Sequence, residues 1–326
     1  MTTRIGAEQL PIPPALRYGL RMDDTHAIGL DLGGTKILAG VVTRDGEVVR
    51  RHERPTPTGS QEELLDGVAA AIEALRRDDG VAAIGLGIPG TIDQPRGRVW
   101  VATNIPLADV DLRDRMEARF GLPVGLENDA NAAAIGEWRV GAARGATDIV
   151  MLTLGTGVGG GVIAGDAPFR GAGGAGVELG HTVVIAHGPP CWGACTGHGH
   201  LEAVASGQAA TVAARKAFGP EADAHSLVGL ANAGDATARE ILAGIGDLLG
   251  IAMGSFANIF NPELIVVGGG FGVAAWDHLM PAAEASLRVE AFPPARDAVR
   301  VVRAELGTDA GLIGAGFVAF EALDRR

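Results

Sequence analysis

Cysteine is scarce in this sequence: the chain holds two among 326 residues. Cys191 and Cys195 are too close together to staple so long a chain, and their scarcity indicates a reducing compartment. Such a close pair is more typical of metal or redox chemistry. Basic charge is also in deficit, because 27 Lys and Arg face 39 Asp and Glu and leave a net charge of −12. This balance disfavours nonspecific contact with nucleic acid or with an anionic membrane surface.

Segments that would export the chain or anchor it are missing as well. The first 26 residues form a Pro-rich leader, with Pro11, Pro13 and Pro14, and they lack the apolar core of a signal peptide. The stretch from Ile149 to Gly165 is apolar, but it is too short and too broken by glycine to span a bilayer. We therefore expect a cytoplasmic protein with neither a membrane nor a nucleic acid as its partner.

Glycine is the residue in excess, with 50 in the chain, about twice the usual frequency. The sequence has no Gly-X-Y period, which excludes collagen, and 47% hydrophobic residues exclude a disordered glycine-rich tract. Of these glycines, 26 fall in seven short blocks, at 33–34, 85–90, 155–161, 171–180, 193–199, 268–272 and 307–316. We expect several of these blocks to form ligand-facing turns, and the last to permit close packing of a helix.

Apolar periodicity predicts an α/β chain, and its length favours two lobes because single cores stop growing near 250 to 300 residues. Strands are expected at 27–31, 37–42, 83–88, 124–126, 148–154, 160–165 and 264–268, and helices at 61–77, 130–138 and 236–260. Two hairpins close across the glycine turns at 33–34 and 155–159, and the segment 264–270 is a third version of this pattern. These repeats indicate an internal duplication with a cleft between two lobes.

Glycine turns let backbone N–H groups approach phosphate oxygens, and Thr35 or Thr156 can add a hydroxyl donor. None of the turns fits the P-loop pattern, and none is expected to open directly into a helix. A hairpin-type phosphate clamp is the candidate that remains. Each turn taken alone could equally be a plain tight turn.

Four motifs resemble the ROK family of sugar kinases, and within it the bacterial glucokinases. They are DLGGTK at 31–36, ENDANA at 127–132, LGTGVGGG at 154–161 and GVELGH at 176–181. The resemblance runs from about Ile28 to Phe317. It implies a two-lobed actin-like/hexokinase (ribonuclease H-like) ATPase fold with the ligand cleft between the lobes. Residues 27–134 would form the small lobe, completed by a helix at 310–326, and residues 135–309 the large lobe.

The resemblance also implies which residues act. Asp129 would be the general base, although a helix N-cap is an alternative role because 130–138 reads as a helix. The implied sugar-binding residues are Asn104, Asn128, Asp129, Glu178, His181 and Glu202. The implied nucleotide-binding residues are Asp31, Gly33, Gly34, Thr35, Lys36, Gly155, Thr156, Gly157, Gly268, Gly269 and Gly270. Glu178 and Glu202 could instead be surface charges, Lys36 a solvated strand residue, and 268–270 a plain strand-end turn.

Residues 181–202 gather both cysteines and four of the eight histidines. We predict a structural zinc ion held by His181, Cys191, Cys195 and His200, with His187 and His198 as possible substitutes. Related kinases commonly have a third cysteine where His200 stands and often space the first two by one residue, so the ligand set stays partly open. The alternative is a reduced cysteine pair without metal. If zinc holds one ring nitrogen of His181, the other can donate to the sugar.

The activity expected from the resemblance is an ATP-dependent glucokinase that uses ATP and Mg²⁺ and forms a homodimer or homotetramer. Kinases for another hexose or an N-acetylated amino sugar, such as fructose, mannose, N-acetylmannosamine or N-acetylglucosamine, share these motifs. A sugar-responsive transcription repressor is the alternative of a different class. It is disfavoured because the 30 residues before Asp31 are Pro-rich and the chain is acidic, so no recognition helix is expected.

Overall fold

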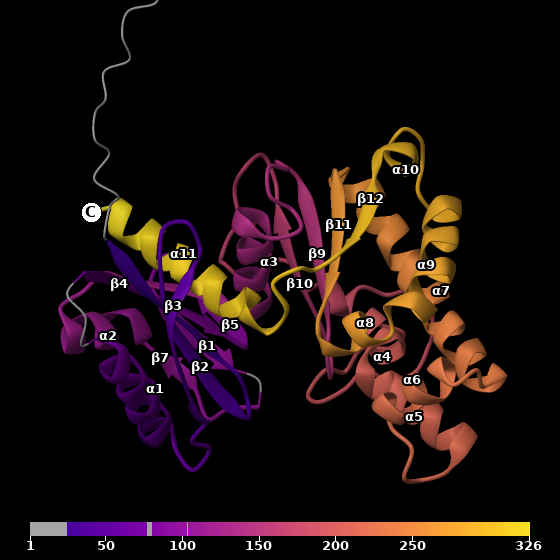
Figure 1. Cartoon of the computed structure of the whole chain (residues 1–326), viewed down its shortest axis with the longest axis horizontal. Helices are drawn as coiled ribbons and strands as arrows, with labels where there is room; N and C mark the ends of the chain where they lie inside the picture. Colours follow the sequence, from indigo (N-terminus) through magenta and orange to yellow (C-terminus); the bar gives the residue numbers. More distant parts are fainter. Residues whose placement is uncertain (1–24, 77–79, 103) are drawn as a thin grey trace, which may run out of the picture.

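The structure is a computed structural model that describes residues 25–76, 80–102 and 104–326. The predicted Pro-rich leader, residues 1–26, lies outside this range except for Thr25 and His26. His26 already belongs to the first strand. Two large sheets lie side by side, with the helix α3 (Asp129–Val140) between them (Figure 1).

The first sheet has the strand order β3-β2-β1-β4-β8. Its strands are β1 (His26–Leu32), β2 (Lys36–Val42), β3 (Val48–Pro55), β4 (Val81–Ile88) and β8 (Val124–Asn128). β1, β2 and β3 pair antiparallel, whereas β1, β4 and β8 pair parallel. One face packs on α1 (Gln61–Leu75) and α2 (Leu112–Phe120), and the other packs on the C-terminal helix α11 (Ala310–Asp324). Three strands therefore end beside one another and point their following loops to the same edge.

The second sheet repeats this plan in the order β10-β9-β11-β12. Its strands are β9 (Ile149–Leu154), β10 (Val158–Ile163), β11 (Leu264–Gly268) and β12 (Arg300–Arg303). β9 and β10 form the antiparallel hairpin, and β9, β11 and β12 pair parallel. Alternate residues of these strands face α3 on one side and the helices of the second half on the other. A hairpin followed by parallel strands in both sheets agrees with the predicted duplication.

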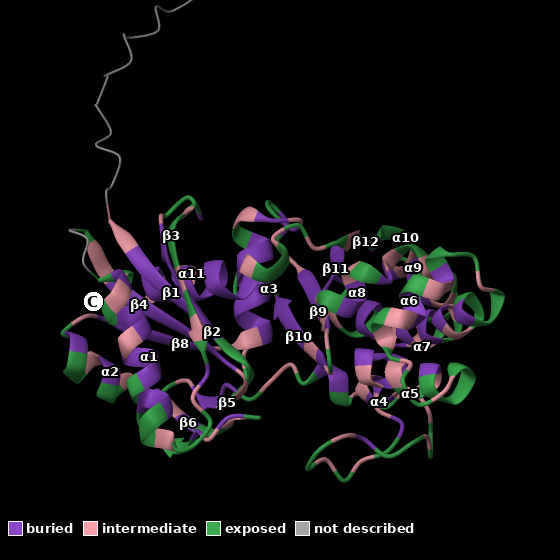
Figure 2. Cartoon of the chain, turned by 60° about the horizontal axis from the view of Figure 1, so that its bottom comes forward, coloured by how far each residue is buried: buried purple, intermediate pink, exposed green. Residues whose placement is uncertain are grey.

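The second sheet's outer face is covered by helices, and the central strands of both sheets are mostly buried (Figure 2). These helices are α4 (Leu201–Ala205), α5 (Gly207–Phe218), α6 (Ala224–Asn232), α7 (Ala236–Phe260), α8 (Gly270–Ala274), α9 (Trp276–Glu290) and α10 (Ala295–Ala298). The smaller elements are β5 (Gly90–Asp93), β6 (Arg98–Ala102) and β7 (Ala108–Val110), which form a third sheet, and the single turns η1 (Leu179–His181) and η2 (Gly307–Asp309).

The third glycine turn differs from the prediction. Gly269 is the N-cap of α8, so this turn does open directly into a helix, and no hairpin strand follows it. The reason is that β12 lies parallel to β11, so the chain must cross back over the sheet between these two strands. Gly269 supplies the positive φ of 81° that starts this crossing. The first two turns are hairpins, as predicted.

The helix α7 is long and apolar enough to cross a membrane by length and composition, although no anchoring segment was predicted from the sequence. In the fold, 56% of the most apolar 18-residue stretch of α7 is buried. A Cβ at Gly246 or Gly250 would lie 2.3 or 2.2 Å from a carbonyl oxygen of α9, so the two helices touch through backbone. The apolar composition of α7 is therefore accounted for by packing inside the protein.

A row of glycines crosses the first sheet. Gly40, Gly29, Gly85 and Gly125 stand opposite one another on β2, β1, β4 and β8. A Cβ at Gly29 would lie 2.1 Å from the oxygen of Leu312, and one at Gly85 would lie 1.8 Å from that of Ala315. Both distances are shorter than any real contact, so α11 lies directly on the backbone of the sheet, and only glycine permits this.

We expect Gly85→Ala to destabilise the protein by on the order of 3 kcal/mol, because its methyl group would meet a backbone oxygen that cannot rotate away. The matched control is Gly244→Ala, on an exposed position of α7 with nothing within 4 Å of its Cβ, which should be neutral or stabilising by up to about 1 kcal/mol. Urea denaturation of the two variants measures the difference. Equal stability of the two variants would contradict this packing.

Candidate functional site

The end of β8 and the start of α3 carry the predicted general base. Asn128 is the N-cap of α3: its Oδ1 accepts from the N–H groups of Ala130 at 2.9 Å and Asn131 at 3.2 Å. The alternative capping role considered for Asp129 thus belongs to Asn128. Asp129 Oδ1 accepts from the N–H of Ala130 at 2.9 Å. Burial raises the pKa of the Asp129 carboxyl, and the hydrogen bonds from backbone and Asn128 oppose this rise.

A second carboxylate faces Asp129 from the end of β1. Burial raises the pKa of Asp31 to about 7, the negative charge of Asp129 adds to the rise, and Lys36 opposes it. Two acids that interact in this way favour a bound cation, since a cation would relieve both the burial cost and the repulsion. Carboxylate oxygen is the donor that Mg²⁺ prefers, so Asp31 fits a magnesium ion.

The first glycine turn follows Asp31 directly. Gly33 N–H donates to the Lys36 carbonyl at 3.0 Å, and the Thr56 hydroxyl donates to the Gly33 carbonyl at 2.7 Å. Gly34, Thr35 and Lys36 are exposed. Lys36 forms an ion pair with Glu53 at 2.9 Å. Asn104 lies beside this turn, since a Cβ on Gly34 would be 3.5 Å from the Asn104 Cβ.

The second and third turns meet at the end of β9. Gly155 N–H donates to the Gly157 carbonyl at 3.0 Å, and the Gly155 carbonyl accepts from Gly207 at the start of α5. A Cβ at Gly269 would lie 2.4 Å from the Leu154 oxygen, so the third turn crosses directly over the end of this strand. The second and third of the predicted nucleotide-facing turns are thus neighbours, as a shared phosphate or nucleoside site requires.

The predicted sugar-binding acids join this region to Asp129. The pKa of Glu178 is raised because surrounding protein limits the solvation of its carboxylate; Asp129 and Glu202 add to the rise, and His181 opposes it. Glu202 Oε2 accepts from the N–H of Val158 at 2.9 Å, and a Cβ at Gly157 would lie 2.2 Å from the same oxygen. Charge interactions therefore connect four acids in one series that ends at the second glycine turn: Asp31, Asp129, Glu178 and Glu202.

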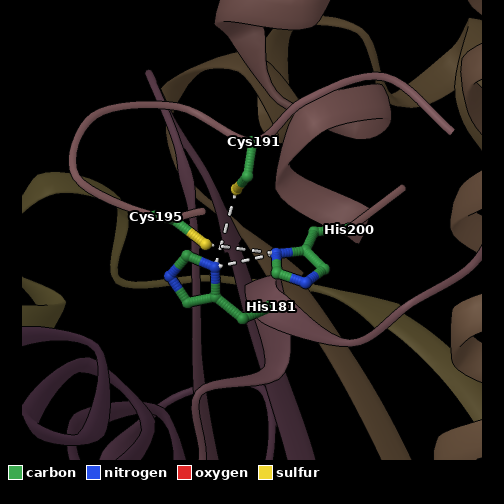
Figure 3. A group of neighbouring side chains, drawn as sticks. All are labelled: His181, Cys191, Cys195 and His200. Atoms are coloured by element: carbon green, nitrogen blue, oxygen red, sulfur yellow. Dashed lines mark hydrogen bonds between the residues drawn. The ribbon is translucent and has the colours of Figure 1, made fainter. Parts of the chain in front are cut away.

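The predicted zinc ligands converge. The ligand atoms of His181, Cys191, Cys195 and His200 all lie within 4.8 Å of one another (Figure 3). The two histidine Nδ1 atoms are 3.2 Å apart, and the Cys191–His181 and Cys195–His200 sulfur–nitrogen separations are both 3.6 Å. Zinc bonds of about 2.3 Å to sulfur and about 2.0 Å to nitrogen, at tetrahedral angles, place nitrogen about 3.3 Å from nitrogen and about 3.5 Å from sulfur. The four residues fit a tetrahedral zinc ion.

The electrostatics of this group also suit a cation. Burial raises the pKa of the Cys191 thiol to about 11, and the nearby Cys195 adds to the rise. A bound cation would invert this preference and hold both cysteines as thiolates. His187 and His198, the substitutes considered from the sequence, are not members of the group found among the described residues. Trp192 Nε1 donates to the Glu202 carbonyl at 3.2 Å, which connects the cysteine loop to one of the predicted sugar-binding residues.

A cavity of about 440 Å³ lies elsewhere, where α2, the start of β8 and the end of α11 meet. None of the predicted site residues is among the described residues that line it. Two residues at this cavity, Arg170 and its partner Glu127, were given no role from the sequence. Arg170 lines the cavity and pairs with Glu127, which is fully buried and directly precedes Asn128. The sequence signal that could have identified Glu127 is a charged residue near the end of an otherwise apolar strand.

The chain matches the model of the ROK family over residues 27–322. A glucokinase from Streptomyces coelicolor is 35% identical over 311 residues, which cover 90% of this chain and 97% of that protein. The structure is similar to a ROK hexokinase from Thermus thermophilus, with a TM-score of 0.81, 38% identity and coverage of 93% and 100% of the two chains. It is also similar to a ROK family glucokinase from Streptomyces griseus in complex with glucose and AMPPNP, with a TM-score of 0.79, 34% identity and coverage of 91% and 99%. The predicted family and fold class are confirmed.

The raised pKa of Asp31 predicts how stability depends on pH without ligands. Its folded value of about 7 exceeds the ordinary 3.8, so the folded state binds the extra proton and loses stability as pH rises between these values. Asp31→Asn should therefore be more stable than the wild type at pH 8, by at most about 4 kcal/mol, and the gap should shrink toward pH 5. Thermal unfolding without Mg²⁺ or nucleotide measures it.

The control is Asp148→Asn. The Thr147 hydroxyl and the Gly165 N–H lower the pKa of Asp148, so its contribution changes only below pH 3.8. The difference between this variant and the wild type should stay flat from pH 5 to 8. A flat difference for Asp31→Asn over the same range would contradict the burial of its charge.

Proposed function

The chain belongs to the ROK family, and on that premise we propose that it is an ATP-dependent glucokinase, which transfers the γ-phosphoryl group of ATP to the 6-hydroxyl of glucose. The observation that carries the proposal is the position of Asp129, a half-buried carboxylate. It interacts with Asp31, beside the first glycine turn, and with Glu178, which in turn interacts with Glu202 at the second turn. A proton acceptor placed between a phosphate clamp and a hydroxyl-binding surface suits phosphoryl transfer to a sugar.

Asp129 would accept the proton of the sugar hydroxyl as its oxygen attacks the phosphorus. The backbone N–H of Ala130 holds one carboxylate oxygen of Asp129, which orients the side chain. Burial raises its pKa above the ordinary value and so makes it a stronger base than an exposed aspartate. Asp31 would hold the Mg²⁺ of the nucleotide complex, which supplies positive charge opposite the transferred group.

The remaining residues would bind and orient the substrates. Backbone N–H groups of the turns 33–36, 155–157 and 268–270 would contact the nucleotide, with the hydroxyls of Thr35 and Thr156 as added donors. Asn104, Asn128, Glu178, His181 and Glu202 would contact the sugar hydroxyls, for which amide and carboxylate groups are suitable partners. The glucose and AMPPNP bound to the Streptomyces griseus relative support this division between sugar and nucleotide.

We also propose that His181, Cys191, Cys195 and His200 hold a structural zinc ion, which leaves no open position for catalysis. Since both histidines present Nδ1 to the centre, Nε2 of His181 stays available to the sugar. The metal would thereby fix the orientation of a sugar-binding ring.

Further features stay proposals of the same kind. Glucose is favoured over other hexoses and amino sugars, and an enzyme over a repressor, by the similarity to glucokinases along nearly the whole chain. We propose that residues 27–134 with 310–326 form one lobe and residues 135–309 the other, although α3 extends across this boundary. A cytoplasmic location and a homodimer or homotetramer are also proposed.

Asp129→Asn should lower kcat for glucose by about 10²- to 10⁴-fold, because the amide keeps the shape of the side chain but cannot accept the proton. The KM for glucose should change little. A coupled assay with glucose, ATP and Mg²⁺ measures both constants. Asp223→Asn, at the N-cap of α6, is the control that should leave kcat unchanged. Near-normal turnover of Asp129→Asn would refute its role as base.

Protein purified without chelator should contain about one zinc per chain by elemental analysis. Removal of zinc, or the double variant Cys191→Ser/Cys195→Ser, should raise the KM for glucose by about tenfold or more while the KM for ATP changes little. The reason is that His181 loses its fixed orientation. Zinc-free enzyme with an unchanged KM for glucose would show that the metal does not position the sugar site.

A further inference from the structure

Arg170 connects three segments that are far apart in the sequence. It lies between β10 and η1, in the segment that ends at Glu178. Its Nε donates to Glu127 on β8, and its Nη2 donates to Glu321 on α11 at 3.3 Å. The Glu127 side chain is 1% exposed, and those of Arg170 and Glu321 are each 21% exposed. An ion pair this buried is held at much lower dielectric than a surface pair.

The Glu127 end of this connection lies beside the proposed general base. Glu127 Oε1 accepts from the N–H of Asn128 at 3.1 Å and from Nδ2 of Asn131 at 3.3 Å. Nε2 of Gln94 donates to the same oxygen at 3.2 Å. One carboxylate oxygen therefore holds the start of α3, while the other receives Arg170. A displacement of Arg170 would therefore move Glu127, which directly precedes Asn128 and lies two residues before Asp129.

The other end of the connection is the sugar-binding segment. The Arg170 carbonyl accepts from the Gly176 N–H at 3.0 Å, which closes residues 170–176 into a loop. This loop lies directly on the first half of the chain, since a Cβ at Gly174 would be 2.5 Å from the Ile92 oxygen. The next residue of the segment, Val177, has a φ of 72°. A β-branched residue rarely adopts this value, so the surrounding contacts must hold it there.

We propose that Arg170 is a positioning residue for phosphoryl transfer: its ion pair with Glu127 sets the spacing between Glu178, which would bind the sugar, and Asp129, which would accept the proton. This role rests on the proposed function. The guanidinium is suited to it because its planar fork reaches two carboxylates at once, Glu127 and Glu321. The strained Val177 lies between the tie and Glu178, so loss of the tie would let this segment relax away from Asp129.

The test compares Arg170→Met with Arg325→Met. Arg325 also pairs with Glu321, but its side chain is 70% exposed and it does not contact Glu127 in the described structure. Arg170→Met should lower kcat/KM for glucose by about 10- to 100-fold, chiefly through a higher KM, with the KM for ATP within about twofold. Hydrogen exchange of residues 171–181 in the sugar-free enzyme should become faster. Arg325→Met should change neither quantity by more than about twofold.

A second variant separates positioning from the cost of an unpaired buried charge. In Glu127→Gln/Arg170→Met both charges are gone, so the melting temperature should recover toward that of the wild type. The KM for glucose and the exchange of 171–181 should stay raised, because the tie is still missing. Recovery of both to wild-type values, or unchanged exchange in Arg170→Met, would overturn the proposal. If the wild type fails to phosphorylate glucose, the proposed function falls, and the exchange measurement still decides whether Arg170 holds the loop.

Discussion

The contact of α11 with the first sheet is the constraint on which the rest of the site depends. The row of glycines lets the helix lie on the backbone of β1, β4 and β8. Its first turn then comes beside Asp31, where a Cβ at Gly311 would be 2.9 Å from the carboxyl carbon. Gly314 meets the Ala132 oxygen of α3, the helix that Asp129 begins, and Glu321 near its end holds Arg170. One helix therefore locates Asp31 and Asp129, the two carboxylates that face each other, and the anchor of the segment proposed to bind sugar.

Charge is concentrated where the fold makes it costly. The pKa values of Asp31, Asp129 and Glu178 are all raised, first because nearby protein limits the solvation of their carboxylates. In two of the three cases, Asp31 and Glu178, neighbouring acids also repel the charge. Folding alone gains nothing from such an arrangement. A cation, a phosphate clamp of N–H groups and sugar hydroxyls would each relieve part of the cost, which explains why these acids suit the activity proposed.

The segment from Arg170 to Glu202 is held at both ends. Arg170 ties its start to β8, and the His/Cys group ties η1 to the start of α4. Glu178 lies between these two anchors, and Glu202 is held by Val158 and, through its carbonyl, by Trp192. Much of this segment has no regular secondary structure, so side-chain ties take the place of a sheet or helix in giving Glu178 and Glu202 fixed positions.

Local patterns in the sequence predicted what depends on near neighbours. The two glycine hairpins, the helix from Ala236 to Phe260 and the group of His181, Cys191, Cys195 and His200 follow from apolar periodicity, glycine position and ligand spacing. The third turn was predicted wrongly, because the strand that follows it, β12, pairs parallel with β11, so the chain enters a helix there instead of closing a hairpin. The Arg170–Glu127 tie joins residues 43 positions apart, and the glycine row meets a helix at the far end of the chain, so no local pattern reports them. The sequence by itself determined the family, the two glycine hairpins, the long helix at 236–260 and the residue types of the site. Only tertiary structure decided which glycines make room for α11 and which charges meet, because those depend on backbones and side chains brought together by the folded chain.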